Sequence, residues 1–106
     1  MTTILHEERL STVVAAVAET GARTVLDLGC GDGDLVLRLA GVAGIGRVTG
    51  IEIDAERVRR AQTRLAGLPA GGARVQLACA SLTRFHPNLA GYDCACLVEV
   101  IEHLPQ

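Results

Sequence analysis

The sequence is poor in aromatic residues and contains no lysine. Aromatic residues account for 2% of the 106 positions, with Phe85, Tyr92 and no tryptophan. A platform of aromatic side chains, on which single-stranded nucleic acids stack, is therefore not available in these residues. All ten basic residues are arginine, and twelve acidic residues bring the formal net charge to −2. The composition therefore indicates no strongly cationic surface, and any nucleic-acid site must be local.

Long hydrophobic runs are also missing. The longest run near the start, residues 13–18, is far shorter than the roughly 18 residues that a membrane span needs. It follows the mixed-charge segment 6–9 rather than a cationic leader, and no small-residue cleavage site comes after it, so a secretory signal is not expected. We therefore expect a cytoplasmic protein without a membrane partner.

The cysteines do not have the spacing of a metal or disulfide motif. Cys30, Cys79, Cys94 and Cys96 include no C-x-x-C pair, and three of them lie inside or at the ends of apolar, strand-like runs. Because free cysteine is among the most buried residue types, we interpret all four as small, reduced core residues. Zinc binding or a disulfide is the less favoured alternative.

The remaining composition is that of one globular domain. Hydrophobic residues make up 49% and charged residues 21%, which excludes a disordered chain, a collagen-like repeat and a low-complexity linker. A chain of 106 residues has room for one core, so we assign residues 1–106 to a single domain.

Hydrophobic periodicity predicts alternating helices and strands. Asp34 and Asp54 are placed to cap the second and third helices. The third helix is expected to turn Arg57, Arg60 and Arg64 to water. The predicted elements are a helix over about 7–20, a strand over 24–28, a helix from 34 to 41, a strand over 48–53, a helix after 54 that ends before 69, and strands over 75–79 and 92–98. This alternation predicts an α/β fold with parallel strands, right-handed crossovers and ligands outside the carboxyl ends of the strands.

The last predicted strand is almost wholly apolar and would form a sheet edge, because the sequence stops at Gln106. An unpaired apolar edge invites association with another strand. We therefore expect the sequence to be the N-terminal portion of a larger domain. Either the rest of that domain or a partner chain is expected to pair with the fourth strand.

The segment 27–33, Asp-Leu-Gly-Cys-Gly-Asp-Gly, is the most informative stretch of the chain. Its alternating glycines permit positive φ and let a ligand lie against bare backbone. A dinucleotide fingerprint would need glycine at position 34, which is Asp34, and the carboxylates of Asp27, Asp32 and Asp34 would repel a pyrophosphate. A ligand with cationic groups fits better, and S-adenosylmethionine carries an ammonium and a sulfonium. The alternative is a turn in which the glycines meet only a steric need.

Polar residues also follow the second and third predicted strands. Glu52 can accept two hydrogen bonds side by side, which matches the cis-diol of a ribose, whereas Asp54 is better placed as a helix cap. Ile53 can pack against an adenine face. Ser81 and Leu82 can read the adenine edge, although a capping role for Ser81 is an equally good interpretation.

Three side chains of metal-ligand type follow the fourth predicted strand, namely Glu99, Glu102 and His103. If the chain turns into a helix near Val100, the three point the same way, because they are three and four residues apart. Two carboxylates and an imidazole suit Mg²⁺ or Mn²⁺ better than structural zinc. The alternative is that His103 acts as a lone general base and the glutamates interact with a helix dipole.

Together these motifs resemble those of class I S-adenosylmethionine-dependent methyltransferases, whose fold is a Rossmann-like parallel sheet. The resemblance rests on the glycine loop at 27–33, on Gly-Ile-Glu at 50–52 and on Glu-Val-Ile-Glu-His-Leu at 99–104. Within that superfamily, the chain most resembles the Hua-enhancer type of 3′-terminal RNA ribose 2′-O-methyltransferases over nearly its whole length.

This resemblance implies an enzyme that binds S-adenosylmethionine and has an RNA 3′ end, not DNA, as its partner. It implies that Glu99, Glu102 and His103 are catalytic residues that bind Mg²⁺ or Mn²⁺ together with a second, downstream histidine. No counterpart of that histidine precedes Gln106, so the 106 residues alone are expected to be inactive. The expected cofactor-binding residues are Asp27, Gly29, Cys30, Gly31, Gly33, Glu52, Ile53, Ser81 and Leu82.

Two alternatives stay open at this point. The segment 99–104 is also similar to one in O-methyltransferases of quinone biosynthesis, so a small phenolic substrate is the first alternative. The second is a truncated, non-catalytic module that binds the cofactor or binds a partner chain through its fourth strand.

Overall fold

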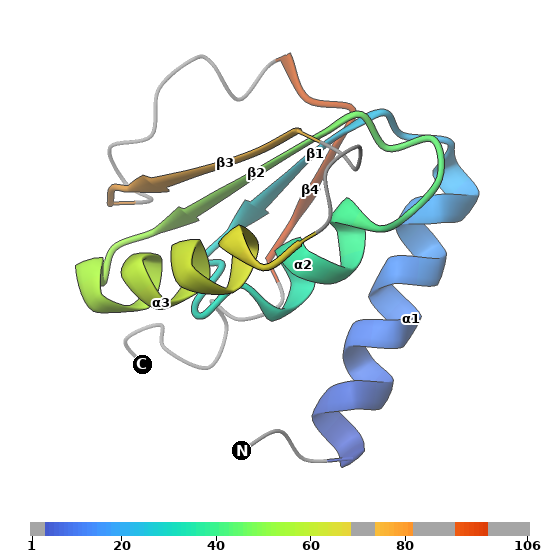
Figure 1. Ribbon diagram of the computed structural model, residues 1–106. Helices are drawn as coiled ribbons and strands as arrows, with labels where there is room; N and C mark the ends of the chain where they lie inside the picture. Colours follow the sequence, from blue (N-terminus) through green and yellow to red (C-terminus); the bar gives the residue numbers. More distant parts are fainter. Residues whose placement is uncertain (1–3, 69–73, 82–90, 98–106) are drawn as a thin grey trace.

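The computed structural model describes residues 4–68, 74–81 and 91–97, and Figure 1 shows its helices beside a four-stranded sheet. In chain order the elements are α1 (Ile4–Thr20), β1 (Thr24–Leu28), α2 (Asp34–Ala40), β2 (Arg47–Glu52), α3 (Ala55–Ala66), β3 (Arg74–Cys79) and β4 (Cys94–Cys96). The strands lie in the order β3-β2-β1-β4, and every neighbouring pair is parallel. The predicted α/β fold with a Rossmann-like parallel sheet is confirmed.

The strand order places a switch point in the middle of the sheet. β2 and β3 lie on one side of β1, whereas β4 returns to its other side. At such a point successive connections leave in opposite directions, and a crevice opens beyond the carboxyl ends of the strands. The glycine loop after β1 lies at this crevice.

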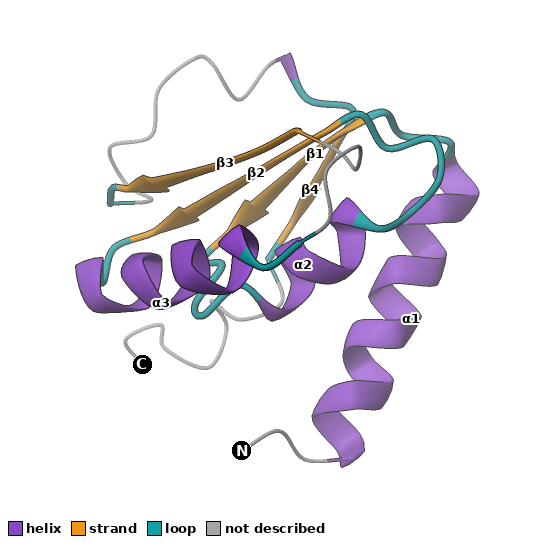
Figure 2. Cartoon of the chain, in the orientation of Figure 1, coloured by secondary structure: helices purple, strands orange, loops and turns teal. Residues whose placement is uncertain are grey.

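Alternate residues of each strand form the core with the helices. The register pairs Val25 of β1 with Val48 of β2 and with Cys94 of β4, so these side chains share one face of the sheet. α2 and α3 lie over this face, and α1 packs beside α2 (Figure 2). The buried apolar cluster contains Leu10, Val17, Ala22, Val25, Cys30, Leu35, Val36, Leu39, Ile45, Val48 and Cys96.

The prediction that all four cysteines are core residues is right for two of them and wrong for one. Cys30 and Cys96 are buried, Cys94 is half-buried and Cys79 is exposed, and all four are free thiols. Cys79 is exposed because it is the last residue of β3, which pairs with β2 alone among the described strands.

The observed element bounds differ from the predicted ones in a few places. α1 begins at Ile4 instead of residue 7, and β4 is limited to Cys94–Cys96, where it pairs with Val25–Asp27 of β1. Asp54 is the N-cap of α3 as predicted, because its side chain accepts a hydrogen bond of 2.9 Å from the amide of Glu56. The N-cap of α2 is Gly33 rather than Asp34.

Across the described ranges, no helix is long and apolar enough to cross a membrane.

Candidate functional site

The glycine loop turns the chain sharply from the end of β1 into α2. Gly29, Gly31 and Gly33 have φ values of 75°, 56° and 91°, in the left-handed region that favours glycine. A Cβ added at Gly33 would also lie 3.0 Å from the Cβ of Ala61 on α3. Glycine is therefore required at position 33 both for the turn and for the close approach of α3.

Four amides of this loop donate hydrogen bonds within the protein. Those of Gly29 and Cys30 donate to the carbonyl oxygen of Ile51 at 2.8 and 2.9 Å, and that of Gly33 donates to the carbonyl of Cys30 at 3.0 Å. The amide of Gly31 donates to Oε1 of Glu52 at 2.9 Å. Phosphate-binding loops instead point their free amides at the anion. The geometry therefore agrees with the exclusion of a pyrophosphate ligand that the sequence predicts.

Glu52 is held in place by both ends of its carboxylate. Oε1 accepts from the amide of Gly31, and Oε2 accepts from the amide of Asp54 at 2.9 Å. The residue is 7% exposed. Because a carboxylate offers about four acceptor positions, these two bonds leave capacity for two hydroxyl groups. Glu52 is therefore a rigid acceptor at the carboxyl edge of the sheet, as a cis-diol requires.

Asp27 lies beneath the loop, with no exposed surface. The register places it on β1 between Gly50 of β2 and Cys96 of β4.

Burial, with help from the charges of Asp27 and Glu52, raises the pKa of Cys30 to about 12. Burial and then the neighbouring Cys94 and Asp27 raise the pKa of Cys96 to about 12 as well. Both thiols are therefore protonated at neutral pH and are not nucleophiles.

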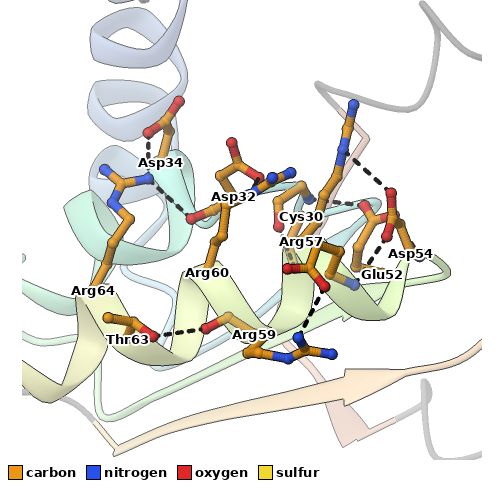
Figure 3. Close-up of polar contacts among 12 residues, drawn as sticks. Cys30, Asp32, Asp34, Glu52, Asp54, Arg57, Arg59, Arg60, Thr63 and Arg64 are labelled. Carbon is orange, nitrogen blue, oxygen red and sulfur yellow. Dashed lines mark hydrogen bonds and ion pairs between the residues drawn. The ribbon is translucent and has the colours of Figure 1, made fainter.

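Arg60 and Arg64 are exposed on α3, as predicted, whereas Arg57 is half-buried; the two exposed arginines also contact the glycine loop. Figure 3 shows both side chains pointing from α3 toward the glycine loop. Nε of Arg60 lies 3.1 Å from Oδ1 of Asp32, and Nη1 of Arg64 lies 2.7 Å from Oδ1 of Asp34. Sequence periodicity identifies the exposed face of α3 but carries no information on residues about 30 positions earlier. One signal in the sequence could have predicted these pairs. Arg60 and Arg64 are one helical turn apart, and the acids that they contact, Asp32 and Asp34, are two residues apart.

Asp34 is neutralised from two sides. Partial burial raises the pKa of its carboxyl, but hydrogen bonds from Arg64 and His6 outweigh that effect and hold the pKa below its ordinary value. Nε2 of His6 on α1 lies 3.3 Å from Oδ2 of Asp34. Asp32 and Asp34 are thus both paired with arginine side chains of α3, and Asp34 also with His6 of α1.

The structure places the other predicted site residues as follows. Ile53 is 69% exposed directly after Glu52, and Ser81 is half-buried after β3. Both lie at the carboxyl edge of the sheet, where the predicted adenine site is. Leu82, Glu99, Glu102 and His103 lie outside the described residues. Within residues 4–68, 74–81 and 91–97, no three His, Cys, Asp or Glu side chains form a metal-binding group, so the metal site stays a prediction.

A parallel sheet with a switch point beside β1, a glycine loop after β1 and an acid after β2 defines a Rossmann-like domain that binds a nucleoside-containing ligand. A family model described as "Methyltransferase domain" matches residues 25–106. The chain belongs to this family of methyltransferase domains.

Relatives and solved structures agree with this family. An uncharacterized methyltransferase of Mycobacterium tuberculosis is 40% identical over 89 residues, covering 84% of this chain and 42% of that protein. The methyltransferase domain of bacterial CtHen1 is 37% identical, with a TM-score of 0.84 over 95% of this chain and 54% of that one. Magnesium protoporphyrin IX methyltransferase of Synechocystis PCC 6803, solved with bound SAM, is 31% identical, with a TM-score of 0.78 over 94% and 47% of the two chains. The chain thus spans less than half the length of the curated relatives it matches.

Proposed function

We propose that this chain forms the cofactor-binding part of an S-adenosylmethionine-dependent methyltransferase. The observation that carries the proposal is the fixed carboxylate of Glu52 beside a glycine loop in which the amides of residues 29, 30, 31 and 33 already have acceptors within the protein. A nucleoside ligand without phosphates fits this combination, whereas a dinucleotide does not. Family membership and the bound SAM of the Synechocystis enzyme support the same ligand.

Different residues of the site bind different parts of the ligand. Glu52 accepts the two ribose hydroxyls, and the exposed Ile53 packs against the adenine face, with Ser81 and Leu82 at the adenine edge. The bare backbone of Gly29 and Gly31, with Cys30 and Gly33 completing the turn, borders the methionine part. Asp27 supplies negative charge beneath the loop, which favours a cationic ligand. When bound, S-adenosylmethionine supplies an activated methyl group.

The acceptor that we propose is the 2′-hydroxyl of a 3′-terminal RNA nucleotide. The support is the resemblance to the Hua-enhancer type and the similarity to the CtHen1 domain over 95% of this chain. Glu99, Glu102 and His103 would hold Mg²⁺ or Mn²⁺. A divalent cation at a ribose hydroxyl lowers the cost of charge that develops on its oxygen.

Calorimetry on the full-length protein tests the cofactor site. Glu52→Gln should weaken the binding of S-adenosylmethionine by about tenfold or more, because charge-assisted hydrogen bonds contribute about 1.5 to 3 kcal/mol each. Glu56→Gln, an exposed position on α3, is the matched control and should bind like the wild type. Equal affinity in Glu52→Gln and wild type would refute the assignment of Glu52.

Labelled cofactor tests the acceptor. The full-length protein, incubated with Mn²⁺ and RNA that ends in either a ribose 2′-hydroxyl or a 2′-deoxy sugar, should label the first RNA and not the second. Equal labelling of the two RNAs would exclude the 2′-oxygen. Labelling of a small phenolic or porphyrin acceptor, without any labelled RNA, would favour a small-molecule enzyme. Cofactor binding without transfer to any acceptor would favour a non-catalytic module.

A further inference from the structure

Two arginines of α3 hold the glycine loop from the side. Arg60 contacts the carboxylate of Asp32 at 3.1 Å. Nη1 of Arg64 donates to the carbonyl oxygen of Asp32 at 2.9 Å and to Oδ1 of Asp34 at 2.7 Å. The two arginines therefore contact both side-chain and backbone atoms of the loop, at Asp32 and Asp34 on either side of Gly33 (Figure 3).

Close packing between α3 and the loop reinforces these contacts. Ala61 has no exposed surface, and its Cβ would lie 3.0 Å from a Cβ at Gly33. One turn earlier on α3, Nη1 of Arg57 would lie 3.7 Å from a Cβ at Gly31. Successive turns of α3 thus face successive residues of the loop. A movement of α3 relative to the loop cannot occur without breaking contacts at several loop positions.

The other side of the loop is bound to the end of β2. The carbonyl of Ile51 accepts from the amides of Gly29 and Cys30, and Glu52 accepts from Gly31. α3 follows β2 after the short segment Ile53–Asp54. A single stretch of chain, residues 51–64, therefore supplies the acid for the ribose, the support beneath the loop and the arginines beside it.

We propose that Arg60 and Arg64 are positioning residues that keep the glycine loop in its cofactor-binding shape. They act through the loop and do not touch the ligand. The identity of that ligand rests on the proposed function. Because the arginines set the shape of the loop, their loss should weaken the binding of S-adenosylmethionine and of S-adenosylhomocysteine by the same factor. A purely electrostatic role predicts a different result, because removing two positive charges would strengthen the binding of the cationic S-adenosylmethionine alone.

Three variants of the full-length protein test the proposal. The double variant Arg60→Gln/Arg64→Gln removes both contacts, and Arg60→Lys/Arg64→Lys keeps the charge. Arg59→Gln is the matched control on the same helix, since Arg59 pairs with Glu56 at 3.0 Å and not with the loop. Unfolding midpoints of all variants show whether each one folds.

Amide hydrogen exchange of the loop peptide is the first measurement, because the amides of residues 29, 30, 31 and 33 are hydrogen-bonded and exchange only when the loop opens. Half-exposed ion pairs shift an equilibrium by up to about fivefold. We expect about fivefold faster loop exchange in the glutamine double variant, partial recovery in the lysine variant and wild-type exchange in Arg59→Gln. Calorimetry should show that the glutamine double variant binds both S-adenosylmethionine and S-adenosylhomocysteine about fivefold more weakly than the wild type does.

Unchanged loop exchange in the glutamine double variant would overturn the proposal, and so would tighter binding of S-adenosylmethionine with unchanged S-adenosylhomocysteine. If the wild-type protein binds neither compound, the proposed function fails. The exchange measurement still decides the positioning role, because it needs no ligand.

Discussion

At the scale of single residues, Glu52 has two roles that reinforce each other. Its carboxylate fixes the glycine loop through Gly31 and the start of α3 through Asp54. A carboxylate that is already oriented loses little freedom when a ribose binds, and such preorganisation favours affinity. The same bonds explain why the loop can be built from glycine and still have one shape.

Small residues let the site pack closely. A Cβ at Gly50 would lie 2.9 Å from Sγ of Cys30 and 2.9 Å from a methyl carbon of Leu77. The sulfur of Cys30 therefore rests on bare backbone of β2, directly behind the loop. Since this thiol is protonated, Cys30 acts as a small apolar support for the turn.

The sequence could predict the site residues that precede or follow a strand, but not those that reach it from elsewhere. Glu52 and the glycines at 29, 31 and 33 stand directly after strands, where the α/β pattern places ligand sites. Arg60 and Arg64 contact acids 28 and 30 positions earlier, and only the packing of α3 on the loop brings them there. The same packing explains why Asp34 binds Arg64 instead of capping α2.

At the scale of secondary-structure elements, periodicity predicted every observed helix and strand in the described ranges. β1 matches its prediction residue for residue, because Gly29 begins the turn immediately after Leu28. β4 is shorter than predicted, because apolar composition indicates strand propensity, whereas the length of a strand depends on its partner. In the region that the structure describes, β4 pairs with Val25–Asp27 of β1 and with no other strand.

The start of β4 depends on an ionised carboxylate. Oδ2 of Asp93 accepts from the amide of Arg23 at 2.8 Å and from that of Thr24, the first residue of β1, at 3.3 Å. These backbone hydrogen bonds hold the pKa of Asp93 below its ordinary value. The folded state therefore favours the ionised form, and this stabilisation is present above the ordinary aspartate pKa of about 4 and is lost as the pH falls through the lowered pKa.

We expect Asp93→Asn to unfold at a lower temperature than the wild type at pH 6, because a neutral amide oxygen accepts the two bonds less strongly. The difference should shrink toward pH 3, where the wild-type carboxyl is increasingly protonated. Thermal unfolding of both proteins across this range measures it, with Glu19→Gln on the exposed surface of α1 as control. A difference that stays constant from pH 6 to pH 3 would contradict the assignment.

At the scale of the whole molecule, side-chain contacts link the three helices and the glycine loop to one another. α1 is joined to α2 at the surface by His6 with Asp34 and by Glu7 with Arg38. α2 begins at the loop, and α3 grips the loop from the other side. The cofactor site is therefore supported by every helix in the described part of the chain, although the residues that would touch the ligand come from the ends of the strands.

This arrangement predicts that α1 is part of the same folding unit as the site. Leu10 on α1 has no exposed surface and lies in the same apolar cluster as Val25 and Val48 of the sheet. Leu10→Ala should lower the free energy of unfolding by about 2 to 4 kcal/mol, because it removes a buried side chain and leaves a cavity. Leu5→Ala, at a position that is 67% exposed on the same helix, should change it by less than about 0.5 kcal/mol.

Urea unfolding of the full-length protein, followed by circular dichroism and by cofactor binding, makes the measurement. If α1 and the site unfold together, both signals of Leu10→Ala should move to lower urea in a single, shared transition. A separate early loss of helical signal, with cofactor binding unchanged at that urea concentration, would show instead that α1 folds independently of the site. In that case the contacts of His6 with Asp34 and of Glu7 with Arg38 would tie α1 to a core that does not depend on it.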